Sequence, residues 1–392
     1  MPHQLQKKTV NFETTGDFEL GMAGFKRKTD YHLYLPSQAP QGLVIFIPGF
    51  GQEAGDYREI FCQKIAQEFN FATLLVDYHC FFARPSIEQG LSFEKEDIAQ
   101  IEKLFLVHQQ PMQGKTPQEG LGFFNEYLKQ KGMTVEVNAT LKPLKNEYQN
   151  GGVMAALDIL NAVDHVLCSN PEIPPDNVIL VGASNGGYIA NLASKFAPKT
   201  FRAVFDNSSW ALPNFIYIVG REYGVPEFKE KLYSHVDVRY FTKTAWTLSP
   251  NLPNTFDGKR FHIRAFTDPQ IEHWAKYNTQ TFFYFVHAQE DLIAPTEPKI
   301  QMATTMLQQG MNVHMEVMSE GDVDGSYVKN LSHGMNLSML TMFKKAYHQL
   351  GDHRPKQSND FKENSVVSYP SDNCIYEFDF STKPISARVY QE

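Results

Sequence analysis

The feature that most constrains this chain is a serine held between two glycines, in the stretch Gly182-Ala-Ser-Asn-Gly186. An apolar run, 177–181, precedes it, and a helix-compatible segment, 187–194, follows it. This order predicts a strand, a sharp turn and a helix, with Ser184 at the turn, where the glycines remove side chains that would clash. We therefore expect the Ser184 hydroxyl to stand clear of the backbone as a nucleophile. The alternative is a glycine-rich turn whose serine only caps the helix.

A nucleophilic serine needs a base, and the base needs an acid that orients it. The aromatic-rich segment 281–287 predicts a buried strand, and Asp291 follows on the loop beyond its carboxyl end, the edge where α/β sheets place their chemistry. Glu290 is the nearest rival. Asp291 is preferred because apolar residues and then a helix-opening proline follow it. The alternative for Asp291 is a solvated loop residue or a carboxylate at a helix N-terminus.

The candidate base is His333. Alternating residues at 312–318 predict a last strand, and a loop leads from it to His333 and then to a helix of about 14 residues. His333 lies 42 residues after Asp291, which leaves room for one helix and one strand between them. The order serine, acid, histidine, each just past a predicted strand, favours a catalytic triad over a His333 that merely starts a helix.

A triad of this kind works with two backbone N–H donors that hold the oxyanion. One is expected from Asn185, the residue after the nucleophile. The other is expected from the loop that follows the predicted strand 43–47, where the chain reads Pro48-Gly-Phe-Gly51. Phe50 is preferred over Gly51 as the second donor. The alternative is that Pro-Gly here only ends the strand in a turn.

In these motifs the chain resembles the α/β-hydrolase superfamily of serine esterases and acyl-transfer enzymes, over residues 30–350 in order. Many relatives carry histidine where this chain has Pro48, but the donor is a backbone amide that this difference leaves intact. The chain looks most like a bacterial branch with a long insertion and a C-terminal extension. The resemblance implies an α/β fold with a mostly parallel central sheet, helices on both faces, and helical or lid insertions.

The expected organisation is one catalytic domain, 1–350, followed by an extension, 351–392. Segment 57–69 has helical apolar spacing, and together with the strands on either side of it forms a βαβ unit, which requires parallel strands. Insertions are expected at about 80–147 and 208–279, because each interval is far longer than a crossover helix needs. In the extension, polar residues 351–371 predict a linker, and alternation resumes after them.

The second insertion is rich in aromatic residues, and in related hydrolases this position carries the lid over the acyl-binding cleft. Trp210 and Tyr217 are therefore candidates for binding the substrate. Packing within the lid itself is the alternative for both.

Composition excludes several other classes of protein. With 392 residues, 42% of them hydrophobic, the chain is long enough for a large core. A net charge of −8 with scattered Lys and Arg argues against nucleic acid and anionic membranes as partners. No apolar run approaches the length of a membrane span and the N-terminus lacks an apolar leader, so we expect a cytoplasmic protein. The 4 cysteines, expected as buried thiols, and the 13 histidines show no ligand spacing, so no metal is expected.

These observations together predict a serine hydrolase that cleaves an ester or thioester of a small-molecule acyl substrate through an acyl-enzyme, with no cofactor. Acyl transfer to a sugar or another alcohol, and peptide hydrolysis, are alternatives on the same triad. A non-catalytic hydrolase fold that serves as a binding or scaffold protein is the alternative from another class. The oligomeric state stays open.

Overall fold

A computed structural model describes residues 5–50, 56–83, 91–112, 114, 116–277, 279–353 and 359–392. Its contacts divide the chain into two compact units. The first consists of Met1–Phe81, Gly151–Pro213 and Asp257–Glu392, and the second of Phe82–Asn150 and Asn214–Phe256. Each unit is described below by itself.

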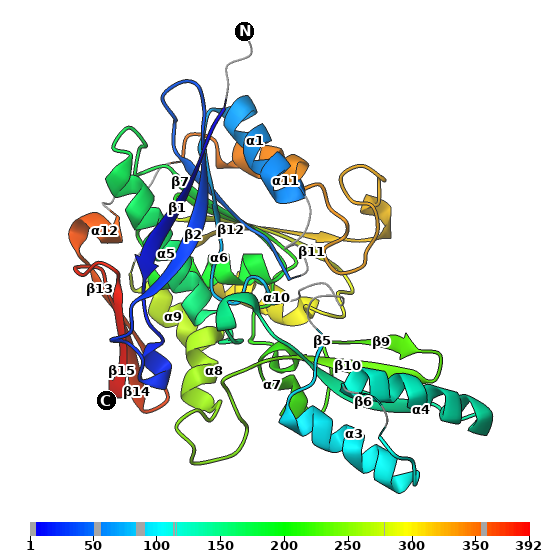
Figure 1. The fold of residues 1–392 in the computed structure, drawn as a ribbon. Coiled ribbons are helices and arrows are strands. Elements are labelled where there is room, and N and C mark those ends of the chain that lie inside the picture. Colours follow the sequence, from blue (N-terminus) through cyan, green and yellow to red (C-terminus); the bar gives the residue numbers. More distant parts are fainter. Residues whose placement is uncertain are drawn as a thin grey trace. The chain divides into compact units, whose positions relative to one another are not determined.

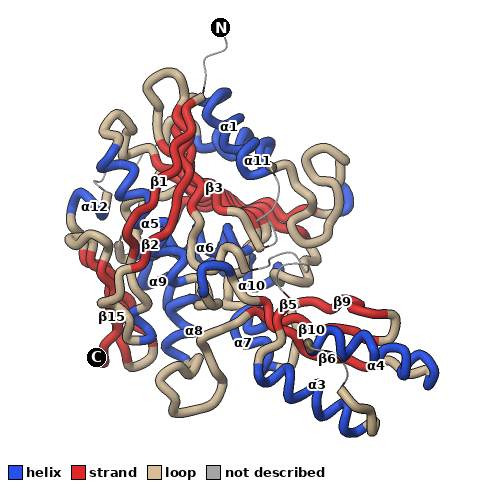
Figure 2. The backbone as a smooth tube through the Cα atoms, in the orientation of Figure 1, coloured by secondary structure: helices blue, strands red, loops and turns tan. Residues whose placement is uncertain are grey.

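The first unit is organised around an 8-stranded sheet (Figures 1 and 2). β1 and β2 form an antiparallel pair, β2 pairs antiparallel with β4, and every other neighbouring pair in the sheet is parallel. Its inner parallel strands are buried at every residue, as expected for strands covered on both faces. In sheet order the strands are β1 (Gln6–Thr14), β2 (Arg27–Leu35), β4 (Ala72–Val76), β3 (Leu43–Ile47), β7 (Val178–Ala183), β8 (Ala203–Asn207), β11 (Phe282–Ala288) and β12 (Asn312–Met318).

Helices connect these strands and cover the sheet. α1 and α11 contact each other and pack on one face, while α5 and α6 pack together on the other (Figure 1). This mostly parallel sheet between helices confirms the predicted α/β-hydrolase fold. The helices of this unit are α1 (Tyr57–Phe69), α5 (Val153–Ser169), α6 (Asn185–Phe196), α8 (Gly258–Arg264), α9 (Asp268–Ala275), α10 (Thr296–Gln308), α11 (Met339–Leu350) and α12 (Asp360–Glu363), with 3-10 turns at Phe18–Leu20 and Glu320–Asp322.

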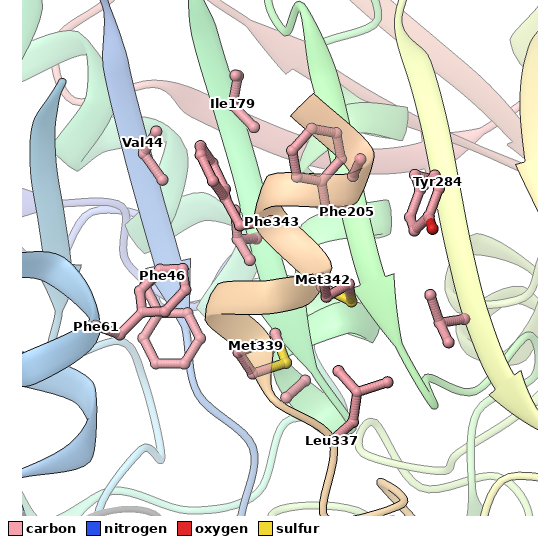
Figure 3. Packing of buried hydrophobic residues seen from close by; sticks show 14 of the residues in the cluster. Val44, Phe46, Phe61, Ile179, Phe205, Tyr284, Leu337, Met339, Met342 and Phe343 are labelled. Carbon is pink, nitrogen blue, oxygen red and sulfur yellow. The ribbon is translucent and has the colours of Figure 1, made fainter. Parts of the chain in front are cut away.

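The core on the α11 face holds the histidine-bearing loop against the sheet. Met342 and Phe343 of α11 are fully buried and lie over the strands that carry Phe46, Ile179 and Phe205 (Figure 3). Truncation of such a buried aromatic costs about 3–5 kcal/mol, so α11 is anchored strongly along its length. The loop before α11, which carries His333, is therefore held in position by this helix.

The C-terminal extension differs from the linker expected at 351–371. Residues 354–358 lie outside the described part, but α12 and a three-stranded antiparallel sheet follow, with β13 (Val366–Ser371), β14 (Cys374–Asp379) and β15 (Ser386–Gln391). Tyr376 of β14 donates to Glu19 at 2.8 Å, and buried Arg264 also binds that carboxylate. The linker prediction was wrong at 360–371. In this segment the buried residues alternate with polar ones, and the apolar residues that bury them are distant in the chain, so the local sequence looks polar.

The second unit contains segments from both predicted insertions. Its sheet has the order β5 (Leu91–Ser92), β6 (Val135–Leu141), β10 (Val236–Thr242), β9 (Phe228–Tyr233), and its core is built from β6, β10 and two helices. The helices are α3 (Lys95–Val107), α4 (Pro117–Lys131) and α7 (Phe215–Tyr223), with a 3-10 turn at Leu144–Asn146. The second insertion is shorter here than the expected 208–279, because residues 257–279 with α8 and α9 fold into the first unit.

Candidate active site

Ser184 lies at the turn between β7 and α6, as the sequence predicts. Its backbone has φ 53° and ψ −122°, a conformation that is strained for a residue with a side chain. A Cβ on Gly186 would lie 1.8 Å from the carbonyl oxygen of Ile47, and one on Gly182 would lie 2.4 Å from the nitrogen of Gly187. Only glycine fits at these two positions, so the motif fixes the turn that presents the serine.

The structure brings the three predicted triad residues together. Oγ of Ser184 lies 2.7 Å from Nε2 of His333. Nδ1 of His333 lies 2.8 Å from Oδ2 and 3.0 Å from Oδ1 of Asp291. With its proton on Nδ1, the imidazole donates to the carboxylate and accepts from the serine hydroxyl. This is the arrangement in which a histidine can remove the serine proton.

The environment of Asp291 keeps it charged. Its side chain is fully buried, and its Oδ1 accepts hydrogen bonds from the amides of Ile293 at 2.9 Å and Ala294 at 2.8 Å. Burial opposes the charge, but the hydrogen bonds from His333 and the two amides outweigh it and hold the pKa of Asp291 below its ordinary value. Glu290, the rival acid, is exposed. The local geometry therefore favours Asp291 as the orienting acid.

Two side chains that the sequence did not single out as neighbours hold the acid loop and the histidine. His287 at the end of β11 is buried, and its Nε2 lies 2.7 Å from the carbonyl of Ala294. Trp210 donates from Nε1 to the carbonyl of Ile293 at 2.8 Å, and its ring stacks on His333 with centroids 6.5 Å apart. Trp210, a candidate for substrate binding, is 5% exposed and contacts the triad directly.

The other candidate for substrate binding, Tyr217, lies on α7 in the second unit. Its role stays a prediction.

The two expected oxyanion donors come from the predicted elements. Asn185 is the first residue of α6, so its N–H has no partner within the helix. Phe50 lies on the loop that follows β3, and this loop touches the serine turn, since a Cβ on Gly49 would lie 3.0 Å from Cβ of Ser184. Gly51, the alternative donor, lies outside the described residues. The donor roles of Asn185 and Phe50 stay predictions.

Sequence reasoning missed a buried ionic network beneath the serine turn. Nζ of Lys299 lies 2.6 Å from Oδ2 of Asp206, and the same oxygen accepts from Asn191 at 2.7 Å and from Ser209 at 2.5 Å. Burial lowers the pKa of Lys299, and the attraction of Asp206 opposes that shift. An aspartate at the end of an apolar strand was the available signal, but its lysine partner is 93 positions away.

A cavity of about 780 Å³ opens beside Ser184 and His333. Gly49 and Phe50 border it, and the remaining walls come from α1 and from the segment that leads into α11. A volume of this size accommodates a small-molecule substrate.

The described residues contain no group of three or more His, Cys, Asp or Glu side chains placed to hold a metal ion. No helix in the described ranges is both long and apolar enough to cross a membrane. Of the cysteines expected as buried thiols, Cys62, Cys80 and Cys374 are buried. Cys168 is exposed, which corrects that expectation, because it lies on the last turn of α5 where the helix leaves the core.

The fold defines a member of the α/β-hydrolase fold class, with a serine at the turn between β7 and α6. The chain belongs to the family described as "Protein of unknown function (DUF2920)", whose match covers residues 8–388. No curated protein matches the chain.

Solved structures with a similar fold include Pyrococcus horikoshii acylaminoacyl peptidase, at 11% identity and a TM-score of 0.47 over 90% of this chain and 42% of the peptidase. The chain thus spans less than half the length of that protein. The esterase Est22 is 12% identical, with a TM-score of 0.45 over 88% of this chain and 80% of the esterase. Est1E from Butyrivibrio proteoclasticus, solved with ferulic acid, is 11% identical, with a TM-score of 0.42 over 83% and 95%. The fold assignment itself rests on strand order and direction.

Proposed function

We propose that this protein is a serine hydrolase that cleaves an ester or thioester through an acyl-enzyme. The observation that carries the proposal is the hydrogen-bonded line from Ser184 through His333 to Asp291, with distances of 2.7 Å and 2.8 Å. A serine used only as a helix cap needs neither a histidine on its hydroxyl nor a buried acid behind that histidine. The strained backbone of Ser184 adds support, because such strain persists where the surrounding structure enforces it.

In the proposed acylation, Oγ of Ser184 attacks the carbonyl carbon and its proton passes to Nε2 of His333. Asp291 stabilises the imidazolium that forms, and the amides of Asn185 and Phe50 donate to the oxyanion. The tetrahedral intermediate then collapses, and His333 returns the proton to the leaving alcohol or thiol.

Deacylation repeats these steps with water, whose proton goes to His333 while its oxygen attacks the acyl-enzyme. The acid product leaves and Ser184 recovers its proton. If a sugar or another alcohol takes the place of water, the same steps yield acyl transfer, which is the alternative reaction on this triad.

Turnover of 4-nitrophenyl butyrate tests the proposal. The intact protein should release nitrophenolate, and Ser184→Ala should lose the activity by at least about 10⁴-fold. Ser194→Ala is the matched control, because Ser194 is buried on the same helix and far along it from the triad. Activity that survives in Ser184→Ala contradicts the nucleophile, and an intact protein that neither turns over esters nor reacts with serine probes supports the scaffold alternative. Product analysis with an added alcohol separates hydrolysis from transfer.

A further inference from the structure

The cavity beside the triad is placed to receive the part of the substrate that adjoins the reacting carbonyl. One wall is the first two turns of α1, and another is the segment from Ser326 to Leu340 that carries His333. Because Ser184 itself lines the cavity, a group that fills it lies within a few bonds of the carbonyl that the serine attacks. The charge and polarity of these walls therefore indicate which chemical groups the substrate carries next to that carbonyl.

The charges on the walls are of one sign. Arg58 and Lys64 line the cavity from α1, and Lys329 lines it from the segment that precedes α11. Among the described lining residues there is no aspartate or glutamate. The whole chain has a net charge of −8, whereas the described lining of the cavity has three cations and no acid. The charge of the cavity is therefore opposite in sign to that of the chain. Cationic walls of a cleft attract an anionic ligand.

Two acids of α1 that lie close in sequence to the lining cations have other partners. On α1, Glu59 binds Lys7 at 3.0 Å and Glu68 binds Lys344 at 2.8 Å. Within the described ranges, none of the three lining cations forms an ion pair. Arg58 helps to lower the pKa of Glu59, but the hydrogen bond from Lys7 has the largest effect.

The acid ahead of Lys329 is used to shape the loop. Oδ1 of Asp324 accepts from the amides of Ser326 at 2.8 Å and Tyr327 at 2.7 Å, and its Oδ2 accepts from the Ser326 hydroxyl at 3.1 Å. Its carboxylate is therefore engaged by its own loop.

Arg58 is also held in place without a complete set of acceptors. Its guanidinium carbon lies 5.2 Å from the ring centre of Phe81, and the side chain is half-buried. Its Nε is buried and has no hydrogen-bond partner among the described residues. The ring contact restrains the guanidinium, and its charge can pair with an anionic ligand.

The remaining walls are mixed: Asn207, Ser326, Asn336 and Ser338 add polar groups, and the larger part is apolar. Phe61 of α1 and Leu337 and Met339 at the start of α11 lie at the carboxyl-end side of the sheet (Figure 3) and line the cavity. The apolar part of the wall suits a hydrocarbon spacer. The cavity therefore combines apolar surface with three cations from two segments of the chain.

From these observations we propose that the substrate is an anionic ester, in which a short hydrocarbon spacer joins the reacting carbonyl to a carboxylate or phosphate bound by Arg58, Lys64 and Lys329. This inference rests on the proposed hydrolase function and names the substrate class of the same site. Both anions share the chemistry that the cations recognise, and the experiment separates them.

The test compares three esters with the same spacer: mono-4-nitrophenyl adipate, its methyl ester, and the 4-nitrophenyl ester of 5-phosphonopentanoic acid. The rate with Ser184→Ala is subtracted. We expect kcat/KM for at least one anionic ester to exceed that of the neutral methyl ester by about tenfold or more at low salt. Because screening weakens such attraction, the preference should shrink at about 0.5 M NaCl. Whichever anion is preferred identifies the group.

Variants then locate the preference. Lys64→Met and Lys329→Met should each reduce the ratio of anionic to neutral kcat/KM, and the double variant should reduce it further. Lys64 and Lys329 are exposed, and thermal melts verify that the variants fold. Lys8→Met is the matched control, since it removes the same charge from an exposed position on β1 that does not line the cavity, and the ratio should stay as in the intact protein.

The outcomes separate the two proposals. Turnover of the methyl ester that depends on Ser184, with no preference for either anion, overturns the anionic substrate while the hydrolase stands. A preference that persists in the double variant overturns the role of these cations. Absence of turnover of all three esters, with 4-nitrophenyl butyrate still cleaved, overturns the anionic substrate alone. Absence of turnover of the butyrate as well overturns the hydrolase too.

Discussion

Nε2 of His333 lies 2.7 Å from Oγ of Ser184, although the two residues are 149 positions apart in the chain. One is fixed by the strained turn between β7 and α6, and the other by a loop anchored through α11 to the same sheet. The backbone therefore fixes where each of the two side chains begins. The proposed chemistry therefore follows from two backbone segments that the parallel sheet brings to one edge.

The role of Asp291 predicts a large effect of a small change. Asp291→Asn keeps the shape but removes the charge that stabilises the imidazolium, so kcat should fall by about 10³- to 10⁴-fold. Glu290→Gln, one residue away and exposed, should change kcat little. Steady-state kinetics with 4-nitrophenyl butyrate measure both. A larger loss in Glu290→Gln than in Asp291→Asn would assign the acid to Glu290.

The lowered pKa of Asp291 predicts how stability depends on pH. Because its folded pKa lies below the unfolded value, Asp291 stabilises the fold above the unfolded value, and this contribution is lost as pH falls through the folded value. Relative to Asp291→Asn, the intact protein should therefore lose more stability between about pH 6 and pH 3. Urea unfolding at both values measures the difference. An equal loss in the two proteins would mean that the pKa of Asp291 is not lowered.

The buried pair of Lys299 and Asp206 predicts asymmetric effects on folding. Removing one charge leaves the other buried without its partner, so Lys299→Met should cost about 3–5 kcal/mol of unfolding free energy. Adding Asp206→Asn should recover part of that loss, because the remaining charge is then removed as well. Denaturant unfolding of Lys299→Met, Asp206→Asn and the double variant gives the coupling. A double variant that loses the sum of the two single effects would show that the groups act independently.

The close approach at Gly186 predicts that an added methyl group disrupts the turn. Gly186→Ala places Cβ 1.8 Å from the carbonyl oxygen of Ile47, and we expect a loss of about 3 kcal/mol of stability together with most of the activity. Gly321→Ala is the control, since its nearest atom is Ser319 Oγ at 3.9 Å. Thermal unfolding and ester turnover measure both. An active, stable Gly186→Ala would contradict the tight turn.

Local signals made much of the site predictable from the sequence. The glycines around Ser184 are required by a turn that touches Ile47. The proline after Asp291 marks the start of α10 at Thr296. In both cases the residues of the motif themselves determine the local backbone conformation. Ser184, Asp291 and His333 were placed past the ends of predicted strands by the same kind of local signal, the residues that end a strand or begin a helix.

Long-range pairing was not predictable in this way. β6 and β10 pair in parallel although residues 135–141 and 236–242 belong to different predicted insertions, and no local pattern announces that they form one sheet. The linker expected at 351–371 failed for the same reason. Tyr369 is buried there by elements far away in the chain, including Lys195, whose carbonyl accepts its hydroxyl at 2.5 Å.

The most direct measurement is the site of reaction with a fluorophosphonate probe, read by mass spectrometry of the digested protein. An activated serine should form one covalent adduct per chain, on the peptide that contains Ser184, and His333→Ala should slow its formation by several orders of magnitude. Ser184→Ala should give no adduct. An adduct on another serine, or equal labelling of the intact protein and Ser184→Ala, would contradict the central claim.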